Sequence, residues 1–304
     1  DPDGLTAAQY HQKAYDMAVA GIDNPGPYAL QPTYYDVNVA TNDRNSEIML
    51  WADHTEGSAR YSESNIDGWN GSPAADGGGE NQAVWMVTWY FNVINGSSSN
   101  TTWVNRAAMF RTVVAGQSYS RMWDRMAKPV GVFTNTFADK TNDSRFDGTF
   151  TSVYRATYGY QSDINNPTAA APIYGANFLQ VNPLDPILTF IPTDPGGIQY
   201  DNTYNDGTEA GYLPGRPDFV APLTTVSRNV HPGLWKIGPY RTNTDYTGDA
   251  VSSTRPFNIL KFSEFYFVAA EAAVKVATGT RSANELINVI RARAGKWRWD
   301  VAAD

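Results

Sequence analysis

Cysteine is missing from the sequence, and its absence excludes several kinds of site. The 304 residues offer no side chain for a disulfide bridge, a thiolate metal ligand or a cysteine nucleophile. A lipidated cysteine is missing from this sequence as well. Because proteins on either side of a membrane can lack cysteine, its absence does not distinguish an oxidising compartment from a reducing one.

Positive charge is in short supply: 23 Lys and Arg stand against 31 Asp and Glu, which gives a formal net charge of -8. Such a chain repels phosphate backbones and anionic lipid, so we expect neither nucleic acid nor bare membrane as a partner. The sequence also lacks an apolar run of about 18 residues, and its opening, DPDGLTAAQY, has neither the basic nor the apolar part of a signal peptide. We expect any signal peptide or anchor to lie outside this chain.

Signatures of nucleotide enzymes and serine hydrolases are missing too. No G-x-S-x-G, G-x-x-x-x-G-K or G-x-G-x-x-G occurs, and the glycines at 77–79 precede Glu80, which would repel a phosphate. The sequence does not exclude a catalytic pair of carboxylates for glycoside hydrolysis, because any two of the 31 acidic residues can meet in space. The sequence by itself identifies no such pair.

Metal sites find little support. The three histidines, His11, His54 and His231, are far apart and form no two-histidine helical pattern, which disfavours zinc catalysis. The segments 139–147 (DKTNDSRFD) and 201–209 (DNTYNDGTE) are rich in oxygen ligands but lack the spacing of a calcium loop. We interpret both as Asn and Asp turns, with an incidental calcium ion as the alternative, and expect no cofactor.

Aromatic residues are plentiful: nine Trp, eighteen Tyr and thirteen Phe make up 13% of the chain. A sugar ring presents a face of C–H bonds and a rim of hydroxyls, so its site needs a flat aromatic side chain beside polar groups. Trp69 and Asn70 lie together on the loop DGWNGS, with Asp67 just before them. This loop is the sharpest local candidate for glycan binding, and a tryptophan that packs against its own scaffold is the alternative for Trp69.

Other tryptophans of the aromatic-rich loop region 51–123 extend the candidate set. Trp85 and Trp89 are four residues apart on an expected helix, a spacing that core packing produces more often than ligand contact. Trp103 follows the loop NGSSSNTT and can serve either purpose. We assign Trp51, Trp123 and Trp235 to the core. The predicted ligand-binding residues are Trp69, Asn70, Asp67, Trp85, Trp89 and Trp103.

The helical elements stand out against long irregular stretches. Residues 6–21 begin with a capping-box pattern at Thr6 and Gln9 and stop at Gly21, which predicts one amphipathic helix. Residues 33–51 predict a short helical or extended piece before an apolar run. The region 161–250 holds eleven of the eighteen prolines and no sustained period, so we expect irregular loops with short strands.

The segment 255–295 contains a helical hairpin. Residues 262–277 are apolar on nearly all sides, and after Gly279 a second capping box at Ser282 and Glu285 opens a helix that ends at Gly295. The unit has the length of a tetratricopeptide repeat, and a lone hairpin would leave its outer face bare. We therefore expect it to stack on other helices as a scaffold element.

This hairpin resembles the hallmark segment of the SusD/RagB family, an Arg-aromatic-x-Glu helix with an Ala-Glu-Ala core and a second helix ending in Arg-x-Arg-Ala-Gly. The matching residues are Lys261, Phe262, Glu264, Ala270, Glu271, Ala272, Arg291, Arg293, Ala294 and Gly295. Residues 14–51 and 124–150 resemble two further family segments in the same order, the latter through Arg125, Pro129, Asp143, Arg145 and Phe146. Lys261 departs from the usual Arg, which keeps the charge and loses the planar fork.

The resemblance implies a mainly α fold: one SusD-like domain over 1–304, with a tetratricopeptide-like helical scaffold, long irregular loops, a few short strands, and N-terminal and C-terminal parts missing. It implies a lipid-anchored, cell-surface glycan-binding protein of the Bacteroidetes type on the outer membrane. Such a protein captures oligosaccharides for a SusC-like, TonB-dependent transporter without cleaving them. Glu264, Glu271, Arg291 and Arg293 carry over only as scaffold residues.

Two other functions stay open at this point. One is a peptide-capturing or purely structural lid of the same kind of transporter. The other is a glycosidase or lyase on a helical scaffold.

Overall fold

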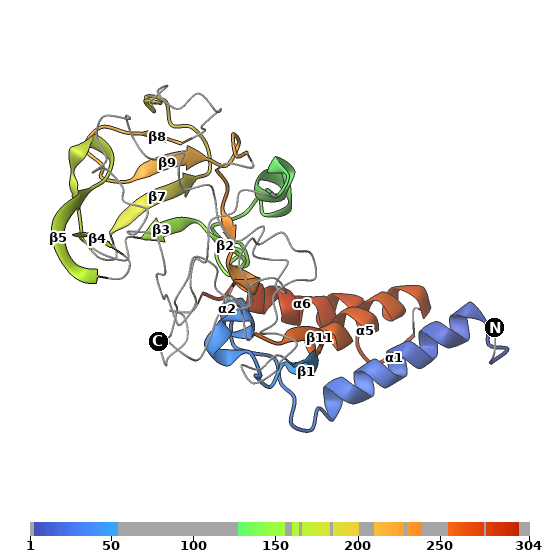
Figure 1. Cartoon of the computed structure of the whole chain (residues 1–304). Helices are drawn as coiled ribbons and strands as arrows, with labels where there is room; N and C mark the ends of the chain where they lie inside the picture. Colours follow the sequence, from blue (N-terminus) through green and yellow to red (C-terminus); the bar gives the residue numbers. More distant parts are fainter. Residues whose placement is uncertain are drawn as a thin grey trace. The chain divides into compact units, whose positions relative to one another are not determined.

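The computed structural model describes residues 3–53, 127–155, 160–163, 166–182, 185–200, 210–227, 230–238, 255–276 and 278–297 (Figure 1). The chain forms two compact units, which are described one at a time. Unit 1 comprises Asp1–Asp53, Lys140–Arg145 and Pro256–Asp304, and unit 2 comprises His54–Asp139 and Phe146–Arg255. The expected single domain over 1–304 stays a prediction.

Unit 1 opens with the predicted helix, α1 (Ala7–Asp23). Its capping box is confirmed: N of Gln9 donates to Oγ1 of Thr6 at 3.3 Å, and N of Thr6 donates to Oε1 of Gln9 at 2.8 Å. The predicted stop at Gly21 is wrong, because the helix continues past it. A Cβ atom at Gly21 would lie 2.4 Å from Cε2 of Phe265, so this glycine lets a second helix approach closely.

A short turn-rich stretch and a strand follow. Helix α2 (Tyr34–Asn38) is capped by the side chain of Thr33, which accepts from N of Asp36 at 3.2 Å. A 3-10 turn, η1 (Ala40–Asn42), leads to strand β1 (Ile48–Ala52). Strand β1 pairs antiparallel with β11 (Phe257–Lys261), from the other end of the chain. The piece expected to be either helical or extended is a helix, and the apolar run that follows it is a strand.

The predicted helical hairpin is confirmed as α5 (Ser263–Val276) and α6 (Ala283–Ala294). Ser282 and Glu285 form the second capping box, with N of Ser282 donating to Oε2 of Glu285 at 2.7 Å. The hydrogen bonds from the backbone and side chain of Ser282 lower the pKa of the Glu285 carboxyl. Both helices therefore begin and end where local sequence signals place them.

Helices α1 and α5 lie side by side in unit 1 (Figure 1), with the hairpin partner α6 against α5. Their shared core consists of Tyr15, Ala18, Val19, Ile22, Phe262, Tyr266, Ala269, Ala270, Ala272, Leu286 and Ile290. The outer side of α5 exposes Phe267 by 48%, Val268 by 46% and Val274 by 70%. Further helices stacked on this face, as a tetratricopeptide-like scaffold requires, stay a prediction. None of the described helices is long and apolar enough to cross a membrane.

The described part of unit 2 is built mainly from strands. They are β2 (Phe150–Thr151), β3 (Val153–Arg155), β4 (Tyr160–Asp163), β5 (Asn166–Tyr174), β6 (Gln180–Val181), β7 (Pro186–Ile191), β8 (Gly211–Tyr212), β9 (Phe219–Pro222) and β10 (Gly233–Leu234). A four-stranded sheet has the order β3-β7-β9-β8, with β7 and β9 parallel. Strand β5 joins β4 and β6 in a second sheet, and β2 pairs with β10. Three short helical turns accompany the strands: η5 (Val132–Thr136), η6 (Ala176–Phe178) and η7 (Trp235–Ile237).

The core of unit 2 gathers on the central sheet and its neighbours. Its buried residues are Phe133, Phe146, Phe150, Tyr154, Ala176, Val181, Ile187, Leu188, Phe190, Ala210, Phe219, Ala221, Leu223 and Val230. The region 161–250 thus contains the short strands that were expected, in a more regular arrangement than its prolines suggested. The mainly α expectation describes unit 1 and does not fit the described residues of unit 2.

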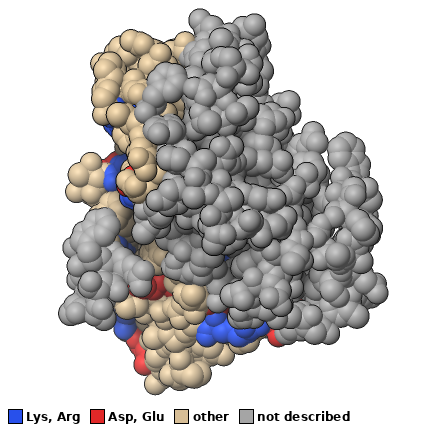
Figure 2. Space-filling model, turned by 60° about the vertical axis from the view of Figure 1, so that its left-hand side comes forward, with Lys and Arg blue, Asp and Glu red and all other residues tan. Residues whose placement is uncertain are grey.

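Charges of both signs lie close together on the described surface. Figure 2 shows blue Lys and Arg atoms beside red Asp and Glu atoms on the face that it draws. Two exposed ion pairs, Arg44 with Asp53 and Arg281 with Asp23, illustrate the mixing. Exposed pairs of this kind contribute little to stability, about 0–1 kcal/mol each.

Candidate functional site

The residues predicted to contact a ligand lie outside the described part of the chain. They are Asp67, Trp69, Asn70, Trp85, Trp89 and Trp103. Three other features of the sequence also lie outside the described residues: His54, the segment 201–209, and Trp123, which was assigned to the core. The ligand-binding assignment therefore stays a prediction. Of the tryptophans assigned to the core, Trp235 is buried and Trp51 is half-buried on β1.

The segment 139–147 has the turn chemistry expected of it. Asp143 accepts from N of Arg145 at 3.0 Å and from Nε of the same residue at 2.8 Å. This side-chain hydrogen bond raises the pKa of the Arg145 guanidinium. Asp147 accepts from Oγ of Ser152 at 3.2 Å. Within the described ranges, no three His, Asp or Glu side chains gather as a metal ion would require, and the incidental calcium ion stays untested.

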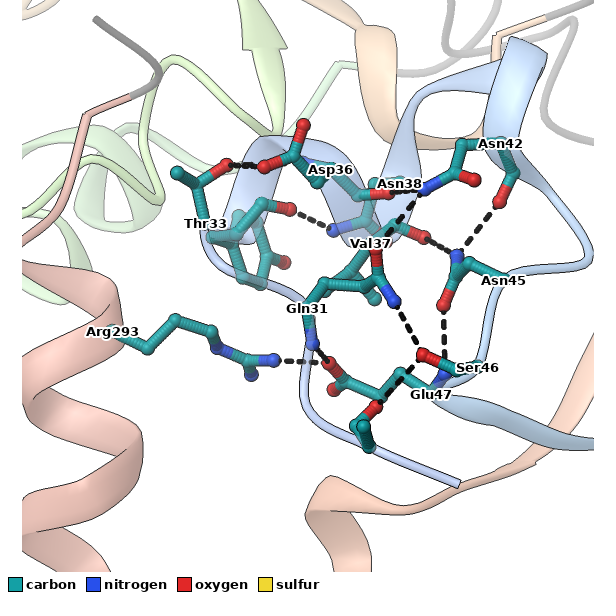
Figure 3. A network of polar contacts seen from close by, with 12 residues as sticks. Gln31, Thr33, Asp36, Val37, Asn38, Asn42, Asn45, Ser46, Glu47 and Arg293 are labelled. Atoms are coloured by element: carbon teal, nitrogen blue, oxygen red, sulfur yellow. Dashed lines mark hydrogen bonds and ion pairs between the residues drawn. The ribbon is translucent and has the colours of Figure 1, made fainter. Parts of the chain in front are cut away.

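The densest polar cluster of unit 1 centres on Glu47, at the start of β1 (Figure 3). Its carboxylate accepts from N of Gln31 at 2.9 Å and pairs with the guanidinium of Arg293 on α6. Its backbone carbonyl accepts from N of Phe262 at 2.8 Å, at the start of α5. One residue therefore joins the turn before α2, the beginning of α5 and the end of α6.

Amide side chains around Glu47 order the turn that precedes it. Asn45 accepts from N of Glu47 at 2.9 Å and donates to the carbonyl of Asn42 at 2.7 Å. Asn42 donates in turn to the side chain of Gln31 at 3.2 Å and to the carbonyl of Asp36 at 2.9 Å. Residues 43–47 lie outside the helices and strands, and these side-chain bonds supply hydrogen-bond partners for this irregular stretch.

The Glu47–Arg293 pair is buried, with exposures of 0% and 10% for the two side chains. Oε1 of Glu47 and Nε of Arg293 have no hydrogen-bond partner among the described residues. A buried pair of this kind is costly to break, because either charge left alone would be desolvated without compensation. The cluster is a scaffold contact, which gives a physical reason for the arginine in the Arg-x-Arg-Ala-Gly segment.

The other hallmark residues divide between a helix cap and the surface. Oε1 of Glu264 accepts from N of Lys261 at 3.0 Å, so the glutamate satisfies a backbone donor at the start of α5. Lys261 makes this hydrogen bond through its backbone N–H, so the bond is the same whether the residue is Lys or the family's usual Arg. Glu271 and Arg291 are exposed. Glu264 and Arg293 thus hold the scaffold together, as the resemblance implies.

A second polar cluster lies in unit 2, where two nitrogen atoms approach one carbonyl. Nδ1 of His231 lies 3.2 Å from the carbonyl oxygen of Pro232, and Nζ of Lys128 donates to the same oxygen at 3.4 Å. Nζ also lies 5.7 Å from the centre of the Phe150 ring. Burial lowers the pKa of Lys128 to about 7, and burial together with the charge of Lys128 lowers the pKa of His231 to about 4.

These two clusters were not predicted from the sequence. Arg293 was identified as a scaffold residue, but its partner Glu47 is 246 positions away, and no local pattern joins them. Lys128 and His231 carry no motif. Within the described residues, both clusters hold chain segments to one another.

Comparisons with known proteins give one family and several distant structures. Residues 47–304 match the model of the SusD family. Surface glycan-binding protein A from Bacteroides thetaiotaomicron is 15% identical, with a TM-score of 0.47, and the match covers 95% of this chain and 43% of that one. The corresponding protein from Bacteroides uniformis is 13% identical, with a TM-score of 0.44 and coverages of 95% and 39%.

A laminarin-binding SusD-like protein is 18% identical, with a TM-score of 0.39 and coverages of 94% and 45%. The chain spans about two fifths of the length of these solved structures. A search of curated proteins finds no match.

Proposed function

Because the chain belongs to the SusD family, we propose that it captures a glycan at the cell surface and delivers it to a SusC-like, TonB-dependent outer-membrane transporter. The observation that carries this proposal is the family match, which extends over residues 47–304 and includes the helical hairpin α5–α6. The match confirms the resemblance seen in the hallmark segment.

The proposed protein binds and does not cleave. In this proposal a lipid anchor holds it on the extracellular face of the outer membrane. The negative net charge supports a neutral ligand over an anionic one, since like charges repel at the surface. The rigid scaffold of unit 1 suits a protein whose ligand contacts lie on other segments.

The proposed contacts are those of the aromatic-rich region. Trp69 supplies the platform for a sugar face, and Asn70 and Asp67 supply hydrogen-bonding groups for the hydroxyl rim. Trp85, Trp89 and Trp103 are further candidates in the same region. An aromatic face paired with an amide and a carboxylate recognises a pyranose without needing a net charge.

The experiment that tests this proposal is glycan binding. An array of soluble polysaccharides identifies a ligand, and calorimetry with that ligand compares the wild type with Trp69→Ala. We expect the substitution to weaken binding by about fivefold to 150-fold, since a lost sugar platform costs roughly 1–3 kcal/mol by analogy with other stacked rings. Phe257→Ala is the matched control, because Phe257 is an aromatic side chain exposed by 69% in unit 1.

Other outcomes would overturn parts of the proposal. Unchanged affinity in Trp69→Ala would move the site elsewhere. New reducing ends after incubation with the bound polysaccharide would identify an enzyme. Binding of peptides and of no glycan, together with co-purification with a barrel transporter, would identify a peptide-capturing lid.

A further inference from the structure

Unit 2 carries a buried histidine that the proposed function does not use. The side chain of His231 is completely buried, and Gly233 and Leu234, which follow it closely, form strand β10, paired with β2. Nδ1 is satisfied by the carbonyl of Pro232 at 3.2 Å, and Nε2 has no hydrogen-bond partner among the described residues. The described surroundings thus suit a neutral imidazole, and no described group accepts a hydrogen bond from a second N–H at Nε2.

The groups that contact or flank this segment do not favour an imidazolium. Lys128 shares the carbonyl of Pro232 with the imidazole. Tyr154, from β3, accepts through its hydroxyl from N of Gly233 at 3.0 Å. Lys236 lies further along the segment, and Arg255 donates to the carbonyl of Gly238 at 3.0 Å. Each of these groups is a cation or a neutral phenol, so a proton on His231 would add like charge to the same region.

The segment 230–238 ties several elements of unit 2 together. Gly233 and Leu234 of β10 pair with Thr151 and Phe150 of β2, and N of Lys236 donates to the carbonyl of Thr149 at 3.2 Å. Val230 at its start is fully buried in the core cluster. A charge placed on His231 can reach water only if this segment moves away from the core.

We propose that His231 and Lys128 form an acid-sensitive switch in unit 2, in which protonation of the buried imidazole releases the segment 230–238 from β2. The neutral imidazole keeps the segment closed. The imidazolium carries a second N–H, at Nε2, that needs solvent, and it places a positive charge next to Lys128. This inference concerns the conformation of unit 2 and does not depend on which ligand the protein binds.

The pH window follows from the shift of the histidine. The pKa of His231 is lowered from 6.5 to about 4 by burial and by the charge of Lys128. Between these two values the opened segment binds more protons than the closed one, so the closed form loses stability as the pH falls from 6.5 towards 4. Above 6.5 the stabilisation is complete, and below 4 no further loss comes from this group.

Hydrogen exchange tests the switch directly. Exchange of the amides in 230–238 is measured at pH 7 and pH 4.5 in the wild type and in His231→Asn, whose amide takes the place of Nδ1 and does not titrate. The quantity compared is the exchange rate of the wild type divided by that of His231→Asn at the same pH. We expect this ratio to be roughly tenfold or more higher at pH 4.5 than at pH 7. His11→Asn, in α1 of unit 1, is the control and should match the wild type.

A second measurement keeps the test decisive if His231→Asn does not fold. Nuclear magnetic resonance of the imidazole C–H protons in the wild type follows the titration of each histidine. One resonance should remain that of a neutral ring down to about pH 5. Titration of every histidine near 6.5, or equal acceleration of exchange in the wild type and His231→Asn, would overturn the proposal.

Discussion

The hydroxyl of Tyr15, on α1, makes two hydrogen bonds to the backbone of one residue, Arg281, in the turn between α5 and α6. It accepts from N of Arg281 at 2.7 Å and donates to its carbonyl oxygen at 2.8 Å. Gly279 lies against the same ring, because a Cβ atom there would come within 2.2 Å of Cζ of Tyr15. The tyrosine therefore fastens the hairpin turn to a helix 266 positions earlier in the chain.

The first prediction concerns this contact. Tyr15→Phe keeps the ring and removes both hydrogen bonds, which leaves a backbone N–H and a carbonyl without their partner. We expect a loss of about 1–3 kcal/mol in the free energy of unfolding, measured by urea denaturation. Tyr28→Phe, another tyrosine packed on the same core cluster, is the control. A loss in Tyr15→Phe no larger than that in Tyr28→Phe would show that the two hydrogen bonds to Arg281 add no stability.

The second prediction concerns the buried ion pair. Arg293→Met leaves the Glu47 carboxylate buried without its partner and should lower the free energy of unfolding by about 3–5 kcal/mol. Arg291→Met removes the same charge from an exposed position two residues earlier and should change stability by less than about 1 kcal/mol. The double variant Arg293→Met with Glu47→Gln should recover part of the loss, since it removes the stranded charge. An additive double variant would contradict the coupling.

The third prediction concerns Gly21. In an ordinary helix, replacing Gly by Ala stabilises by about 1 kcal/mol. Here the added methyl group would lie 2.4 Å from the ring of Phe265, so we expect the sign to reverse and Gly21→Ala to destabilise by about 1–3 kcal/mol. Gly131→Ala is the control, because among the described residues its Cβ would meet only Asn135, at 3.6 Å. Thermal denaturation of both variants compares the signs.

The fourth prediction concerns Lys128. Burial lowers its pKa from 10.5 to about 7, so between these values the unfolded chain binds more protons than the folded one. Its contribution therefore makes the protein more stable as the pH rises from 7 to 10. Lys128→Met should flatten this dependence when urea midpoints are compared at pH 7 and pH 9.5. Lys236→Met, in the same unit, should leave the slope as in the wild type, and a steep slope in Lys128→Met would refute the assignment.

Local signals gave the helices of unit 1 from the sequence with few errors. Each capping box satisfies backbone donors within one helical turn, through Thr6 with Gln9 in α1 and Ser282 with Glu285 in α6. Three or four neighbouring residues therefore suffice to predict where each helix starts. The error at Gly21 has the opposite cause. A glycine inside a helix can mark its end or a close approach, and only the position of Phe265 decides between them.

Unit 2 was harder to predict, because its strands are short and paired with distant partners. Strand β7 pairs with β9 across 31 positions between Leu188 and Phe219, and β2 pairs with β10 across 84 positions between Phe150 and Leu234. Two-residue strands such as β2 and β10 carry no alternating pattern, and prolines at strand ends, such as Pro186 and Pro222, suggest loops.

The sequence by itself determined the family, the capped helices and the kinds of site that are excluded because the necessary residues or motifs are absent. Each of these depends on residue types or on spacings of a few positions. Tertiary structure decided which residues come together: Glu47 with Arg293, Tyr15 with the backbone of Arg281, and His231 with Lys128. These pairs are separated by 103 to 266 positions, and their energies come from burial and desolvation, which exist only after the chain has folded.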